Sequence, residues 1–200
     1  MKRNRLVLLL LVVVMAVVLP VAVFAQANDT IVIRGFGNIT SFNPLLSSDG
    51  ASVQAYALLW PNPFKTDSFT GAPVPALTDW SISDDGLTYT FKIKPDAVWS
   101  DGTPITSDDM IFSLNAILSP DINTVLESNV SSVDHVTKVD DKTYQVVLKS
   151  VDCAALSLLG GIPFLPSHKF AADFSDFATN VENTQPDISG GPYILDSWTP

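Results

Sequence analysis

The segment from Leu87 to Lys94 alternates strictly between apolar and polar residues, and this pattern constrains the fold more than any other feature of the chain. Its apolar positions are Leu87, Tyr89, Phe91 and Ile93. Because successive side chains of a strand point to opposite faces, one face of this strand is expected in a core and the other in solvent. Asp84-Asp85-Gly86 supplies a turn before it, and Trp80 and Ile82 alternate with serines before that turn, so the sequence predicts a β-hairpin.

A second hairpin is predicted further along the chain. Residues 133–139 form its first strand, residues 140–142 its turn, and Tyr144, Val146 and Leu148 share one face of its second strand. Between the hairpins, Thr106 is placed to cap a helix that runs to about Leu118, with Asp109 reaching back to the amide of the cap.

Shorter elements complete the predicted order. Strands are expected at 31–33 and 193–198, and helices at 51–60 and at 153–159, where Cys153 is expected to be a small core residue. Strands and helices follow one another without a βαβ rhythm. We therefore expect a mixed α+β fold with a mostly antiparallel sheet.

The N-terminus has the three parts of a secretory signal peptide. A basic head, Met1–Arg5, precedes an unbroken apolar run of fourteen residues, Leu6–Leu19, and small residues around Ala25 form the exit. Cleavage after Ala25 is expected to leave 175 of the 200 residues. The sequence thus predicts an exported protein, in the periplasm or on the outer face of the cell membrane.

The exported part is strongly acidic. Three of the 11 Lys and Arg residues leave with the leader, so eight face 21 Asp and Glu, a net charge of −13. Such a chain repels phosphate backbones, and no nucleic-acid partner is expected. Cys153 is the single cysteine, so stability is expected from a core rather than from an internal disulfide.

No usual catalytic or metal motif is present in the sequence. The nucleophile elbow, the H-E-x-x-H zinc motif and the phosphate loop are all missing, and His135 and His168 share no ligand spacing. We expect no catalytic residue, metal or cofactor. The alternative that stays open is a secreted hydrolase with paired carboxylates, drawn from the pairs Asp84/Asp85, Asp108/Asp109 and Asp140/Asp141. An extracellular structural module is a third possibility.

The block from Tyr89 to Ser113 carries a resemblance to a known family. An aromatic strand with outward basic residues leads into the turn Trp99-Ser100-Asp101-Gly102, and Thr106-Ser107-Asp108-Asp109 then opens a helix. This block resembles the oligopeptide and dipeptide receptors of ABC importers, a family of bacterial extracellular solute-binding proteins. Further pieces in family order are Phe42-Asn43-Pro44, Pro75–Trp80, Asp140–Val146, Pro166-Ser167-His168 and Gly190–Leu195.

The resemblance implies part of a two-lobed receptor with a type II periplasmic-binding-protein fold. After the leader at 1–25, residues 26–60 would begin lobe I, 61–187 would form an extra subdomain, and 188–200 would return to the lobe I core sheet. The chain would be the N-terminal part of the receptor. Its partners would be an oligopeptide or dipeptide ligand and the membrane permease subunits of an ABC importer.

The resemblance also implies where a ligand would touch this part of the receptor. The loop Ser48-Asp49-Gly50-Ala51 would border the cleft and meet an extended peptide through backbone groups. The alternative for these four residues is a plain surface loop. Residues of the diagnostic block, including Asp108 and Asp109, would be scaffold rather than ligand contacts.

Overall fold

A computed structural model describes residue 35 and residues 37–199 of the chain. The predicted leader and the predicted strand at 31–33 lie outside the described residues. Within them, no helix has the length and the apolar character that crossing a membrane requires.

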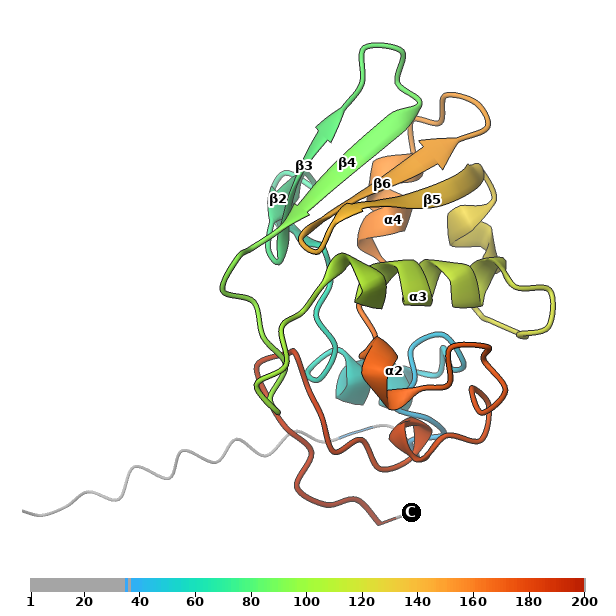
Figure 1. The fold of residues 1–200 in the computed structure, drawn as a ribbon. Helices are drawn as coiled ribbons and strands as arrows, with labels where there is room; N and C mark the ends of the chain where they lie inside the picture. The colour runs from blue at the N-terminus through green and yellow to red at the C-terminus, as the bar shows by residue number, and fades with distance from the viewer. Residues whose placement is uncertain (1–34, 36, 200) are drawn as a thin grey trace, which may run out of the picture. The chain divides into compact units, whose positions relative to one another are not determined.

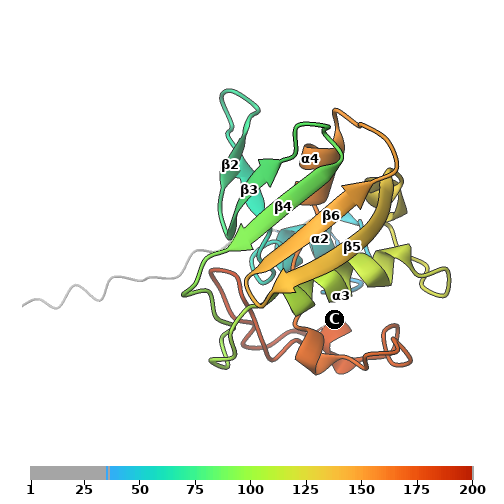
Figure 2. The same cartoon turned by 45° about the horizontal axis from the view of Figure 1, so that its top comes forward.

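The two predicted hairpins join into one four-stranded antiparallel sheet with the order β3-β4-β6-β5. The first hairpin consists of β3 (Thr78–Ile82) and β4 (Thr88–Ile93), and the second of β5 (Val133–Asp140) and β6 (Thr143–Leu148). The hairpins meet where β4 pairs with β6, with Phe91 opposite Tyr144. Figure 2 shows the four strands side by side. Both hairpins and their turns confirm the sequence pattern.

One face of the sheet forms the core of the described unit. Phe91 and Tyr144 are both 1% exposed, and their rings stack with centroids 5.0 Å apart. Helix α3 (Ser107–Leu118) lies across the β6 and β5 half of the sheet and buries Met110, Leu114 and Ile117 (Figure 1). The opposite face carries polar residues, as the alternation in β4 predicts.

A small second sheet precedes the main one. It pairs β1 (Phe64–Thr66) with β2 (Pro73–Pro75), and Gly71 at its turn adopts a φ of +71°. The sequence pattern did not predict these strands. A proline at each end of a three-residue strand removes ladder donors, and such strands are tolerated only at an edge.

The remaining regular elements are short. They are the helices α2 (Gly50–Tyr56) and α4 (Ala155–Gly160), and the 3-10 turns η1 (Glu127–Val130), η2 (Ser167–Lys169) and η3 (Val181–Asn183). Helix α2 confirms the helix predicted at 51–60 but ends four residues earlier. The side chains of Phe112, Phe170, Phe174 and Phe177 gather into one aromatic cluster beside α3.

Two sequence-based expectations are wrong. Residues 193–198 form no strand, because no strand of the described chain lies beside them; Tyr193 and Ile194 stay 56% and 61% exposed. Cys153 is exposed rather than buried, since it precedes α4, and the buried residues of that helix are Ala155, Leu159 and Gly160.

Candidate functional site

The predicted ligand loop, Ser48–Ala51, leads directly into helix α2. Ser48 and Gly50 are exposed, and Ala51 is buried against the core. Asp49 has extended backbone geometry and is the N-cap of α2, where its Oδ1 accepts a hydrogen bond of 2.9 Å from the amide of Ser52. Aspartate is a preferred residue at this position because it satisfies an amide that the helix leaves unpaired.

The carboxylate of Asp49 also ties the loop to the preceding segment. Its Oδ2 accepts hydrogen bonds of 2.6 Å from the hydroxyls of Ser47 and Thr40. The bond from Ser47, followed by those from Thr40 and Ser52, holds the pKa of Asp49 far below its usual range. The carboxylate therefore stays ionised, and both of its oxygens already accept hydrogen bonds from neighbouring residues of the chain. It positions the loop, in which Ser48 and Gly50 are exposed.

The segment before the loop is joined to the region that follows α3. The carbonyl oxygen of Leu45 accepts hydrogen bonds of 2.9 Å from the hydroxyl of Thr124 and from the amide of Val125. Two parts of the chain about eighty residues apart are thus held together. One is the segment that leads to Ser48, and the other begins at the end of α3.

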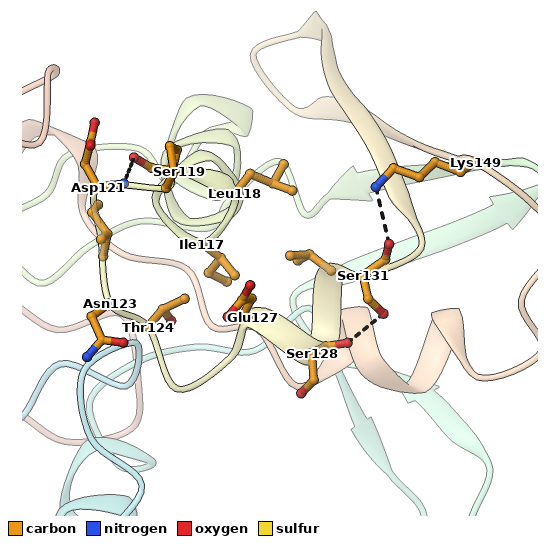
Figure 3. A pocket seen from close by; sticks show the side chains of 13 residues that line it. Ile117, Leu118, Ser119, Asp121, Asn123, Thr124, Glu127, Ser128, Ser131 and Lys149 are labelled. Atoms are coloured by element: carbon orange, nitrogen blue, oxygen red, sulfur yellow. Dashed lines mark hydrogen bonds between the residues drawn. The ribbon is translucent and has the colours of Figure 1, made fainter.

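A cavity of about 730 Å³ lies in this second region, at the C-terminal end of α3. We call it the α3 cavity. Its size is within the range of typical small-molecule sites. Figure 3 shows the end of α3, with Ser119 and Asp121, on one side of the cavity, and Lys149 with Ser131 on the other. The residues that line it are Ile117, Leu118, Ser119, Pro120, Asp121, Ile122, Asn123, Thr124, Glu127, Ser128, Val130, Ser131 and Lys149.

Sequence reasoning missed the α3 cavity. The residues from 119 to 131 carry no motif, and their part in the cavity depends on how the chain turns after Leu118. The only signal in the sequence was the stop at Ser119-Pro120 followed by a stretch rich in hydroxyl, amide and carboxylate side chains.

A smaller hollow of about 70 Å³ lies between α2 and the loop after α4. Its walls include Tyr56, Trp60 and Leu126. Burial, together with the charge of Asp49, raises the pKa of Tyr56 above its ordinary value. The phenol of Tyr56 is therefore harder to ionise than an exposed tyrosine, in part because of the charge of Asp49 in the predicted loop.

The diagnostic block of the sequence is structural. Asp109 is 2% exposed and accepts hydrogen bonds from the amide of Thr106 at 2.9 Å, from the indole of Trp99 at 3.2 Å, and from the amide and hydroxyl of Ser167 at 2.9 and 2.7 Å. The first of these bonds belongs to the predicted capping box. The aspartate thus joins the W-S-D-G turn, α3 and the proline loop, and has no free face for a ligand.

The other acidic pairs are engaged in turns or ion pairs. Asp85 accepts from the hydroxyl of Ser83 and the amide of Leu87, and Asp140 accepts from the amide of Lys142. Lys138 lies 2.7 Å from Asp108 and 2.8 Å from Asp141. Over the part of the chain that the structure describes, no three His, Cys, Asp or Glu side chains come together as metal ligands would.

Comparison with known proteins identifies the family. Residues 72–200 match the family model described as "Bacterial extracellular solute-binding proteins, family 5 Middle". A probable ABC transporter-binding protein of Deinococcus radiodurans is 33% identical over 176 residues, which cover 79% of this chain and 29% of that protein. The oligopeptide-binding protein AppA of Bacillus subtilis is 28% identical over 175 residues, 86% of this chain and 32% of AppA.

Solved structures agree with this family. AppA of Bacillus subtilis, in complex with a nonapeptide, superimposes with a TM-score of 0.75 at 28% identity over 82% of this chain and 33% of AppA. NikZ of Campylobacter jejuni, in complex with Ni(L-His), gives 0.71 at 26% identity over 82% of this chain and 32% of NikZ. These relatives have the type II periplasmic-binding fold expected from the sequence. The chain spans about a third of their length, and it belongs to family 5 of the bacterial extracellular solute-binding proteins.

Proposed function

We propose that this protein is part of a receptor that captures peptides, or similar small solutes, outside the cell and delivers them to the permease subunits of an ABC importer. The observation that carries the proposal is the family match over residues 72–200. The family is one of solute-binding proteins rather than of enzymes, which agrees with the sequence-based expectation of a chain without catalytic residues. The basic head and apolar run at the N-terminus support export.

The peptide is proposed to lie along the loop Ser48–Ala51. Support comes from the exposure of Ser48 and Gly50, whose backbone groups can pair with an extended chain, and from Asp49, which fixes their conformation. The α3 cavity is joined through Thr124 to Leu45, in the segment that leads to this loop, and has room for a side chain. We also propose the domain division expected from the sequence. Lobe I would comprise residues 26–60 and 188–200, and the extra subdomain residues 61–187.

A thermal-shift screen tests the function. The chain is heated with di-, tri- and pentapeptide pools, with oligosaccharides, and with Ni²⁺, each at a concentration of about 10 mM or more, which is about ten times a millimolar Kd. Because this chain is proposed to supply one wall of a two-lobed cleft, its affinity for peptides is expected to be no better than about millimolar, worth about 4 kcal/mol. A ligand at about ten times its Kd then adds about 1.4 kcal/mol and raises Tm by about 3–6 °C.

The same samples distinguish a receptor from a hydrolase. A receptor gives a shift with peptides and leaves them intact by mass spectrometry. Shortened peptides, or shifts limited to saccharides, would contradict the proposal. Replacing Ser48 by Pro, which alters the local backbone without changing the charge of the site, should abolish the shift while leaving the Tm of the free protein within about 2 °C.

A further inference from the structure

The wall of the α3 cavity is rich in groups that accept hydrogen bonds. Five of its side chains carry hydroxyl or amide oxygens and two carry carboxylates, against one cation, Lys149. An ammonium or guanidinium group has only donors, three or five of them, and is complementary to such a wall. The hydroxyls and the amide can donate as well as accept, so the preference for a cation over an anion comes from the two carboxylates.

The two carboxylates of the wall are free to bind. Among the described residues, neither Asp121 nor Glu127 pairs its carboxylate with a hydrogen-bond donor or a cation of the chain. In each of the acidic pairs discussed above, by contrast, at least one carboxylate is engaged. Glu127 is exposed at the start of η1, and Figure 3 shows its side chain beside Thr124 and below Ile117 of α3.

The end of α3 adds negative potential to the same place. The last carbonyl groups of a helix have no partner within it and carry a partial negative charge that favours a cation. Helix α3 has no basic residue in its last turn, and Ile117, Leu118 and Ser119 of that end line the cavity. The helix end is therefore not neutralised by the chain's own side chains.

The one cation of the wall lies on the side of the cavity away from Ser119 and Asp121. The ammonium of Lys149 donates a hydrogen bond of 3.4 Å to the carbonyl oxygen of Ser131, on the side of the cavity opposite to Ser119 and Asp121 (Figure 3). The hydroxyl of Ser131 in turn donates to the carbonyl oxygen of Ser128 at 3.0 Å. The space beside Asp121, Glu127 and the end of α3 thus lacks a positive charge.

We infer that the α3 cavity is a subsite for a cationic group of the bound solute, an alkylammonium or guanidinium carried by a peptide. The inference rests on the proposed function, because it assumes that peptides reach this face of the protein. Its recognition chemistry is independent of the Ser48–Ala51 loop, since none of those four residues lines the cavity.

Three blocked or partly blocked peptides test the inference. Acetyl-Ala-Lys-Ala-amide presents a cationic side chain alone, acetyl-Ala-Gln-Ala-amide is its neutral counterpart, and Ala-Gln-Ala-amide presents a cationic N-terminus alone. Each is titrated into the ¹⁵N-labelled chain, and amide shifts of cavity residues are followed. We expect the lysine peptide to bind about two- to fivefold more tightly than its neutral counterpart, the range of a solvent-exposed ion pair. The third peptide shows whether the N-terminus serves equally.

Two variants of opposite sign and one control locate the effect. Glu127→Gln should remove most of the preference for the lysine peptide, while Lys149→Gln should increase it. Asp84→Asn changes the charge by the same amount in the turn between β3 and β4, does not line the cavity, and should leave the preference unchanged. All three residues are exposed, so the variants are expected to fold.

The outcomes separate the inference from the proposed function. Equal binding of the lysine and glutamine peptides, or a preference that Glu127→Gln does not reduce, overturns the cationic subsite and leaves peptide capture standing. A preference lost equally in Asp84→Asn would reveal an effect of net charge alone, and likewise overturns the subsite. Absence of shifts with all three peptides contradicts both proposals.

Discussion

At the scale of single residues, the clearest physical tension in the described chain lies at Glu182. Its side chain is 3% exposed, yet it accepts only one hydrogen bond, of 3.2 Å, from the amide of Asp187. Lys169 lies 4.0 Å away but is engaged with Asp187 at 2.6 Å. Burial first, and then the charge of Asp187, raise the pKa of Glu182 from 4.5 to about 7.

This raised pKa predicts a pH dependence of stability. Between pH 4.5 and about 7 the folded chain binds more protons at Glu182 than the unfolded chain does, so the contribution of Glu182 is complete below 4.5 and is lost as pH rises to about 7. Glu182→Gln should flatten this part of the profile. Urea unfolding at pH 5 and pH 8 measures it, with Glu127→Gln as the matched control at an exposed site. A slope unchanged by Glu182→Gln would show that burial there is less costly than the geometry indicates.

Asp109 carries a second prediction at this scale. Asp109→Ala should lower the free energy of unfolding by at least about 3 kcal/mol, because it leaves the donors of Trp99, Thr106 and Ser167 without their partner. Asp108→Ala, which removes only an exposed ion pair with Lys138, should cost at most about 1 kcal/mol. Chemical denaturation compares the two. Comparable losses would mean that the buried network is not what stabilises this region.

At the scale of elements, local sequence patterns correctly predicted the hairpins and helix α3, which depend mainly on interactions between residues close in the sequence. The alternation of Tyr89, Phe91 and Ile93 and the capping box of Thr106 act within a few residues, and the hairpins and α3 follow them closely. The strand expected at 193–198 has the same local character but no partner among the described strands, so it does not form. A strand forms only beside a partner strand, and the alternation of apolar and polar residues in one segment does not show whether such a partner is present.

The candidate site was predictable only in part for the same reason. The loop Ser48–Ala51 came from the family resemblance, and its use as a ligand contact stays a prediction. The carboxylate of Asp49 accepts hydrogen bonds from Ser47 and Thr40. These bonds depend on how the neighbouring segment folds, which the sequence pattern does not reveal. The α3 cavity is bounded by residues from Ile117 to Lys149, brought together by the packing of α3 against β5 and by the turn after the helix.

Two glycines make a testable contrast between elements. A Cβ atom at Gly191 would lie closer to the backbone of Leu58 and Leu59 than an ordinary van der Waals contact allows, at 2.8 Å from the carbonyl group of Leu59. The oxygen of that carbonyl also accepts hydrogen bonds from the amides of Gly190 and Gly191. Gly191→Ala should therefore cost about 1–3 kcal/mol. Gly50→Ala has no atom within 4 Å and should be neutral or stabilise α2 by up to about 1 kcal/mol. Thermal unfolding of both variants checks this, and a tolerated Gly191→Ala would refute the close approach.

At the scale of the whole molecule, the sequence predicts that the exported form begins near residue 26. The basic head, the fourteen-residue apolar run and the small-residue exit predict cleavage after Ala25 or Ala27. Intact-mass spectrometry of secreted protein should find an N-terminus at Gln26 or Asn28. Replacing Ala25 by a bulky residue such as Trp should slow or shift the cut, and secreted material that still starts at Met1 would contradict the prediction.

The connectivity of the sheet also predicts an order of events when the chain folds. The two hairpins close locally and can form in microseconds, but β4 and β6 pair across 51 to 59 residues. The buried pair Asn43 and Asn183 closes over 140 residues, which costs about 2 kcal/mol more in loop entropy than a ten-residue closure. The segment that leads into the loop at Ser48 is thus expected to dock last, after the sheet and α3 are in place. A nascent chain would acquire its core well before the wall proposed to meet the solute.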